Sequence, residues 1–149
     1  MRLKPPSGDS LSEAPSYTIS FYYRKILVPV DGSETSLKAL MVAADLATRY
    51  GSRIVVVSAR PRGAGELEDP LVKAKERLKG LPVNASYKSI EYDPKNESPQ
   101  AAVIKEIISE GYDLVILGAR GKTWLSEISL GGFALSLIVN APVSVFVVR

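Results

Sequence analysis

Short strand-like runs alternate with helical stretches along most of the chain, and this alternation constrains the fold more than any other feature of the sequence. Four runs are rich in Val, Ile and Leu, as expected for strands buried on both faces, and the third alternates loosely, as an edge strand does. The expected strands cover residues 25–30, 53–58, 83–92, 113–117 and 143–148. Alternation at this spacing predicts a single-domain, five-stranded parallel sheet with helices on both faces.

Capping residues mark the ends of the expected helices. Ser33 and Ser98 each precede a helical stretch and can cap it with a hydroxyl, and a proline follows Ser98 at the first helical position. Gly51 and Gly111 follow the ends of these two stretches, where a left-handed C-cap is common. The second helical stretch, Leu67–Leu78, is more charged and its apolar pattern is weaker. These signals support the alternating assignment.

The N-terminal segment differs in composition from the rest of the chain. Residues 1–16 hold three prolines and four serines and too few apolar side chains to form a core. Residues 17–23 then alternate like a strand. We expect a flexible arm over residues 1–23, followed by one folded domain over residues 24–149. The alternating segment can extend the first strand, which we favour, or can add to the sheet of a partner.

The amino acids that are missing exclude several kinds of chemistry. The chain has no Cys and no His, so disulfides, Cys or His metal sites and every nucleophile that needs an imidazole base are excluded. The net charge of +3 suits an anionic small ligand but is too small to argue for nucleic acid. No apolar run approaches the roughly 20 residues of a membrane span, and the N-terminus lacks a signal-peptide pattern, so we expect a cytoplasmic location and no membrane partner.

Polar and glycine-rich segments follow two of the expected strands. One is Asp31–Ser33, after the first strand, and the other is Gly118–Gly132, after the fourth. In parallel sheets, ligands bind at the carboxyl ends of the strands, where the winding direction reverses. The two segments can share such a site only if the first and fourth strands are neighbours. We therefore predict the strand order 3-2-1-4-5.

The glycines of the second segment form two pairs that suit an anion. Gly118 and Gly121 come directly after a strand, where backbone N–H groups without a Cβ beside them can face a phosphate. Gly131 and Gly132 open a helix, whose unpaired amides and dipole favour negative charge. Arg120 can lean towards the phosphates or remain a solvated loop charge. The alternative is that the glycines serve only a tight turn and close helix packing.

Three segments of the chain together resemble the universal stress protein family. Gly118, Gly121 and Gly131 match its pattern of Gly-x-x-Gly, nine residues, and then Gly, and residues 25–33 and 140–148 are similar to its first strand and its ending. The resemblance covers about residues 24–149. It implies a universal stress protein domain with an adenine nucleotide alpha hydrolase-like (Rossmann-like) fold. It also implies a homodimer and binding of ATP or AMP, with or without Mg.

The resemblance assigns roles to residues on the nucleoside side of the site. Asp31 corresponds to the acidic residue that meets the nucleoside, and Pro29 and Val30 line the same wall. Ser58 or Ala59 corresponds to the backbone contact with adenine. On the phosphate side, Gly118 and Gly121 correspond to the glycines that contact ribose and phosphate, and Gly131 corresponds to the glycine that opens the last helix. No catalytic residue and no metal ligand is assigned.

The chain departs from the family where the last helix begins. The family has Ser or Thr after the third glycine, whereas this chain has Gly132, followed by Phe133 and Ala134. Two hydroxyls that would reach phosphate are therefore missing, although the backbone amides remain. A lost hydrogen bond to a charged group is worth about 1.5–3 kcal/mol, which is tenfold or more in affinity.

We expect an adenine-nucleotide-binding universal stress response protein that regulates rather than catalyses, because no general base and no carboxylate pair is evident. The alternatives are an interaction module of the same fold that binds no nucleotide, a slow Mg-dependent ATPase that uses Asp31, and a flavodoxin-like FMN carrier.

The last strand is expected to join two copies of the chain. Residues 143–148 are apolar and would lie at the edge of the sheet, where unpaired N–H and C=O groups invite pairing. We therefore expect a homodimer through this strand, with two copies related by a two-fold axis. The alternative is that the N-terminal arm covers this edge in a monomer.

Overall fold

The computed structural model describes residues 22–65, 68–120 and 130–149. Nearly all of the expected arm, and Gly121 of the first glycine pair, therefore lie outside the described residues. The elements in chain order are β1 (Lys25–Pro29), α1 (Glu34–Tyr50), β2 (Arg53–Pro61), α2 (Pro70–Leu78), β3 (Asn84–Tyr92), α3 (Pro99–Glu110), β4 (Leu114–Gly118), α4 (Gly132–Asn140) and β5 (Ser144–Val148).

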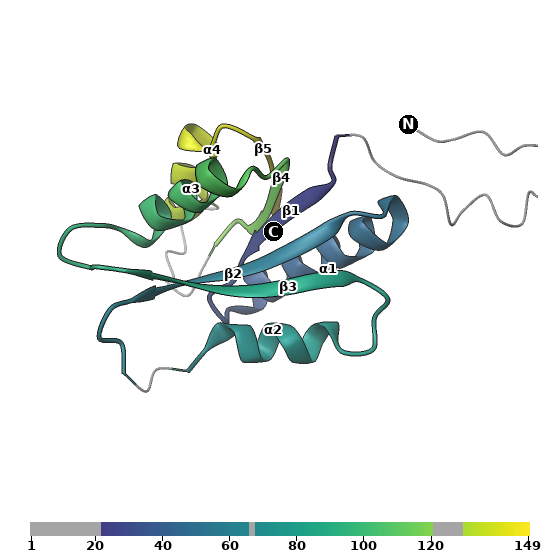
Figure 1. Ribbon diagram of the computed structural model, residues 1–149, viewed down its shortest axis with the longest axis horizontal. Coiled ribbons are helices and arrows are strands. Elements are labelled where there is room, and N and C mark those ends of the chain that lie inside the picture. Colours follow the sequence, from purple (N-terminus) through teal and green to yellow (C-terminus); the bar gives the residue numbers. More distant parts are fainter. Residues whose placement is uncertain (1–21, 66–67, 121–129) are drawn as a thin grey trace, which may run out of the picture.

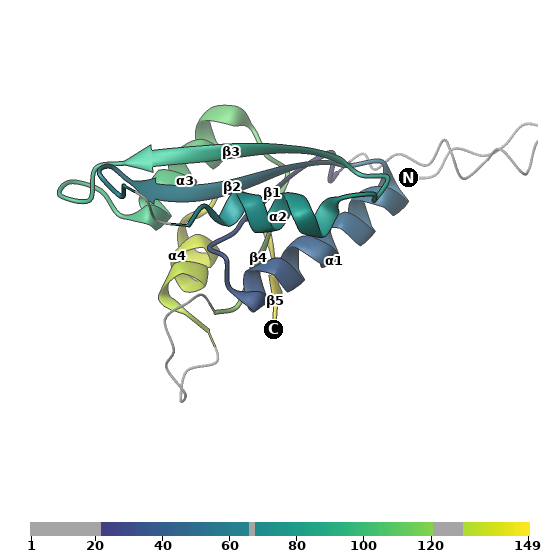
Figure 2. The ribbon, with the colours of Figure 1, turned by 90° about the horizontal axis from the view of Figure 1, so that it is seen from below.

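The strands form one parallel sheet in the order β3-β2-β1-β4-β5, so the predicted order is confirmed. The helices α1 and α2 cover one face, and α3 and α4 cover the other (Figure 1). A view from below shows β2 and β3 running together as the longest strands of the sheet (Figure 2). None of the helices in the described ranges is long and apolar enough to cross a membrane.

Each face of the sheet packs its own apolar core. In the centre, Leu27 and Val28 of β1 are fully buried and point to opposite faces, as adjacent strand residues must. Val28 joins the core under α1 and α2, and Leu27 joins the core under α3 and α4. The central strands are therefore anchored from both sides, and their carboxyl ends are held in fixed positions.

The expected caps are present, with one difference in the second helix. The Ser33 and Ser98 hydroxyls accept from backbone N–H groups, and Gly51 adopts a left-handed conformation. However, α2 begins at Pro70 rather than near Leu67, and Asp69 caps it by accepting from a backbone N–H at 3.0 Å. An Asp-Pro pair is a strong start signal that outweighs the apolar spacing.

Strand β2 is longer than expected and ends at Pro61. Pro61 was predicted to begin a loop, so the prediction was wrong for that residue. Pro61 pairs with Tyr92 of β3, whereas β1 ends earlier, where Pro29 pairs with Val57. The carbonyl of Val57 accepts from the N–H of Val30, and alternation directs the nitrogen of Pro61 to the same side. No strand lies there, so the missing donor of proline breaks no ladder bond.

A polar cluster ties α3 to the sheet. Glu106 of α3 is buried, and its carboxylate accepts from Lys88 of β3 at 2.8 Å and from the Tyr112 hydroxyl at 2.9 Å. Burial, and next the hydrogen bond to Glu106, raise the pKa of Tyr112. This cluster fixes the orientation of α3, whose N-terminal end forms one wall of the cavity described below.

Replacing Tyr112 with Phe should therefore destabilise the fold. The variant leaves one oxygen of the buried Glu106 without its donor, which lowers the free energy of unfolding by about 1–3 kcal/mol. Urea denaturation followed by circular dichroism measures this. Tyr50→Phe is the control, because Tyr50 is 46% exposed at the end of α1 and its loss should change stability by less than about 0.5 kcal/mol. Equal effects of the two substitutions would contradict the anchoring role.

Candidate functional site

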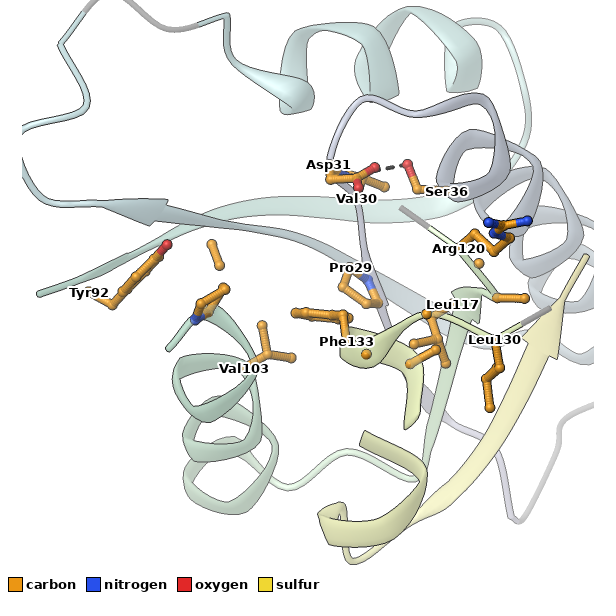
Figure 3. Close-up of a pocket in the computed structure, with 17 residues that line it drawn as sticks. Pro29, Val30, Asp31, Ser36, Tyr92, Val103, Leu117, Arg120, Leu130 and Phe133 are labelled. Carbon is orange, nitrogen blue, oxygen red and sulfur yellow. Dashed lines mark hydrogen bonds between the residues drawn. The ribbon is translucent and has the colours of Figure 1, made fainter. Parts of the chain in front are cut away.

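A cavity of about 420 Å³ opens at the carboxyl ends of β1 and β4, where the winding direction of the sheet reverses (Figure 3). Its size is within the range of small-ligand pockets. The ends of β1, β2, β3 and β4, the start of α3 and the first turn of α4 all contribute to its walls. Segments far apart in the sequence therefore meet there, as the predicted strand order requires.

The wall from β1 contains Pro29, Val30 and Asp31, as expected. Asp31 stabilises the turn before α1, because one of its carboxylate oxygens accepts from the Ser33 N–H at 2.9 Å. The hydroxyl of Ser36 donates to the Ser33 carbonyl at 2.9 Å and accepts from the Asp31 N–H at 3.3 Å. This bonding pattern places the Asp31 carboxyl at the cavity rim.

Of the two residues expected at the end of β2, Ala59 lines the cavity and Ser58 does not. The Ser58 side chain is buried, and alternation turns it to the face covered by α1 and α2. The backbone N–H and C=O groups of Ala59 point to the other edge of β2 from those of Ser58. Because the Val57 carbonyl reaches β1 by accepting from Val30, alternation directs the N–H and C=O of Ala59 to the same side. At that level β1 has ended, so both groups point into the cavity.

The wall opposite β2 comes from the end of β4 and the start of α4. Gly118 and Arg120 line it, as do residues 131–134, all of which were predicted site residues. Gly131 is the N-cap of α4, and its N–H donates to the Ala119 carbonyl at 2.6 Å. Gly131 has no side chain to cap the next amides, and the first turn of α4 that carries these amides lines the cavity. Arg120 is the one cation among the described lining residues.

The glycines of the predicted pairs are required for different reasons. A Cβ on Gly118 would lie 2.8 Å from the Thr35 methyl and 3.0 Å from the Thr35 backbone, so this glycine lets α1 pack against β4. A Cβ on Gly132 would meet nothing within 4 Å, and Gly132 does not have a positive φ. Close packing therefore explains Gly118, whereas neither space nor backbone geometry requires glycine at position 132.

Sequence reasoning missed the wall that β3 and α3 provide. Tyr92 at the end of β3, and Pro99 and Val103 in α3, line the cavity. Figure 3 shows Tyr92 and Val103 on the side away from Arg120. The motif search considered only segments that directly follow the first and fourth strands. The sequence contained one relevant signal, namely the length of the third strand. A strand of this length carries its last residue, Tyr92, past the end of β1.

The fold and the cavity define a class, namely α/β proteins with a cavity at the switch point of a five-stranded parallel sheet. The chain belongs to the universal stress protein family, which matches residues 22–149. A universal stress protein of Methanocaldococcus jannaschii is 32% identical over 145 residues, which cover 85% of this chain and 82% of the relative.

Solved structures share the fold. The universal stress protein UspA from Lactobacillus plantarum superposes with a TM-score of 0.67 at 21% identity, covering 87% of this chain and 100% of that protein. A universal stress protein in complex with cAMP superposes with a TM-score of 0.68 at 17% identity, covering 86% of this chain and 98% of that protein.

Adding one methyl group to each of two glycines should separate their roles. Gly118→Ala forces the start of α1 away from β4, which should lower the free energy of unfolding by about 1–3 kcal/mol. Gly132→Ala is the matched control, because its Cβ enters open space, and stability should change by less than about 0.5 kcal/mol. Thermal and urea denaturation measure both. A stable Gly118→Ala protein would show that α1 does not need this close approach.

Proposed function

We propose that the protein binds an adenine nucleotide in the cavity at the switch point and acts through that binding rather than through turnover. The observation that carries this proposal is the orientation of the Ala59 backbone, which directs a donor and an acceptor into an otherwise apolar part of the cavity. Adenine presents an acceptor nitrogen next to its amino donor, so the pair complements its edge. The solved relative in complex with cAMP gives independent support.

The remaining walls suit the other parts of a nucleotide. Asp31 lies at the rim, where its carboxylate can accept from a ribose hydroxyl. The amides of the first turn of α4 and the Arg120 guanidinium offer donors and positive charge to phosphate. The base, the sugar and the phosphate can therefore each contact a different wall. The walls follow one another in the order in which these three groups are bonded.

Binding without efficient hydrolysis agrees with the carboxylates available. Asp31 is the one acid among the described lining residues, and its carboxylate already accepts within the turn before α1. The described residues contain no group of three or more His, Cys, Asp or Glu side chains that could hold a metal ion. A Mg²⁺ ion in this site would accordingly depend mainly on the phosphates of the nucleotide for its ligands.

We further infer that two copies of the chain associate through β5. This strand is the edge of the sheet, and its side chains and the outer face of α4 leave several apolar groups exposed, among them Phe146 and Val139. The Val148 carbonyl accepts from the N–H of Ala119, directly after β4, so alternation directs the N–H and C=O of Val145 and Val147 outwards. Such an edge can pair with a second copy. A role as an interaction module would use the same surface.

Filling the base end of the cavity should weaken nucleotide binding. We expect the wild-type protein to bind ATP and AMP saturably in isothermal titration calorimetry. Ala59→Leu places three further carbon atoms in the cavity and should weaken both ligands on the order of tenfold or more. Ala101→Leu makes the same change on the exposed side of α3 and should leave both affinities unchanged. Absence of binding by the wild type would reject the proposed function.

Removing one outward-facing donor from β5 should dissociate the dimer. Val145→Pro deletes an edge N–H without breaking a bond to β4, and light scattering should then give the mass of a single chain. Val145→Leu retains the donor and should remain dimeric. A wild-type protein with the mass of one chain, or a Val145→Pro variant with the mass of two, would contradict pairing through β5.

A further inference from the structure

The cavity wall that β4 and α4 build offers a limited set of hydrogen-bond donors. The amides of residues 132–134 have no acceptor within α4, because the first helical bond runs from the Leu135 N–H to the Gly131 carbonyl at 3.0 Å. The N–H of Gly131 itself is already used, since it donates to the Ala119 carbonyl. The Arg120 guanidinium is the one cation among the described lining residues. Donors for an anion therefore come from one helical turn and one side chain.

Side-chain hydroxyls add little to this set. Ser36 lines the cavity, but its hydroxyl donates to the Ser33 carbonyl at 2.9 Å. Tyr92 bears the other hydroxyl of the described lining, and Figure 3 shows this residue on the side away from Arg120. Residues 131–134 carry no hydroxyl at all. The described part of this wall can therefore satisfy the oxygens of one phosphate group but offers no second set of donors to a phosphate chain.

The charge of the lining is also small. Arg120 and Asp31 are the charged side chains among the described lining residues, and their charges cancel. The N-terminus of α4 contributes a partial charge of roughly +0.5. Residues 121–129, which lie outside the described residues, contain one Lys and one Glu, so that segment has no net charge. A phosphate monoester carries about −1.5 to −2 charges at pH 7, so a single such group already exceeds the positive charge that the lining provides.

We propose that the cavity selects nucleotides with a single phosphate group and binds adenosine monophosphate more tightly than the diphosphate or the triphosphate. This inference rests on the proposed function and names the ligand class of the site. A monoester phosphate presents three acceptor oxygens and its full charge to the donors. Attaching a second phosphate takes one oxygen and part of the charge away from the group that is bonded to the ribose. The added phosphates meet no further cation in the described lining, and the Asp31 carboxylate repels them.

Isothermal titration calorimetry with adenosine, AMP, ADP and ATP at constant ionic strength tests this inference. AMP should bind more tightly than adenosine and more tightly than ATP, each on the order of tenfold or more, with ADP between AMP and ATP. Adding Mg²⁺ should not reverse this order. The described lining offers the ion only the Asp31 carboxylate, which already accepts from the Ser33 N–H at 2.9 Å.

Two variants identify the cause of the preference. Arg120→Gln should weaken AMP on the order of tenfold and leave adenosine unchanged, because the lost cation interacts with the phosphate alone. Gly132→Lys places a cation in open space at the start of α4, so it should strengthen ATP more than AMP and narrow the difference between them. Gly132→Met is the matched control, because it adds a side chain of similar length without charge and should leave the ratio of the two affinities unchanged.

Binding of ATP as tight as that of AMP, an equal loss of adenosine and AMP affinity in Arg120→Gln, or equal effects of Gly132→Lys and Gly132→Met would overturn the inference while leaving nucleotide binding intact. Failure of the wild type to bind any of the four compounds would reject the proposed function itself.

Discussion

The parallel pairing of β1 with β4 is the contact on which the site depends. Ile26 pairs with Leu114, and just before this pair the Asp113 carboxylate accepts from the N–H groups of Arg24 and Lys25 at 3.1 and 2.9 Å. From these neighbouring strands the chain leaves to opposite faces, into α1 after β1 and into α4 after β4. The space between the two departing segments is the cavity, as expected at a switch point of a parallel sheet.

Much of this arrangement could be predicted from local sequence signals. Apolar runs bounded by capping residues such as Ser33 and Ser98 gave the element order, and the requirement that two polar segments share one site gave the strand order. The length of β2 and the participation of Tyr92 could not be obtained in this way. Both depend on the register between strands, which places Pro61 opposite Tyr92 and leaves both beyond the end of β1.

The glycines show why a motif alone is an incomplete guide to a site. Gly118 and Gly132 belong to the same sequence pattern, and both line the cavity. Nevertheless, the first is required by the approach of Thr35, whereas the second has open space beside it. Neither packing nor backbone conformation therefore explains the missing hydroxyl at position 132.

The central claim is that an adenine nucleotide occupies the cavity with its base at the Ala59 end. Titration of isotopically labelled protein with AMP, followed through backbone amide resonances, tests this most directly. The account predicts saturable shifts at Ala59, at the residues next to Tyr92 and in the first turn of α4, because ring currents and phosphate charge act there, while β5 remains unchanged. Saturable shifts confined to β5 or the outer face of α4, or no saturable shift at all, would contradict it.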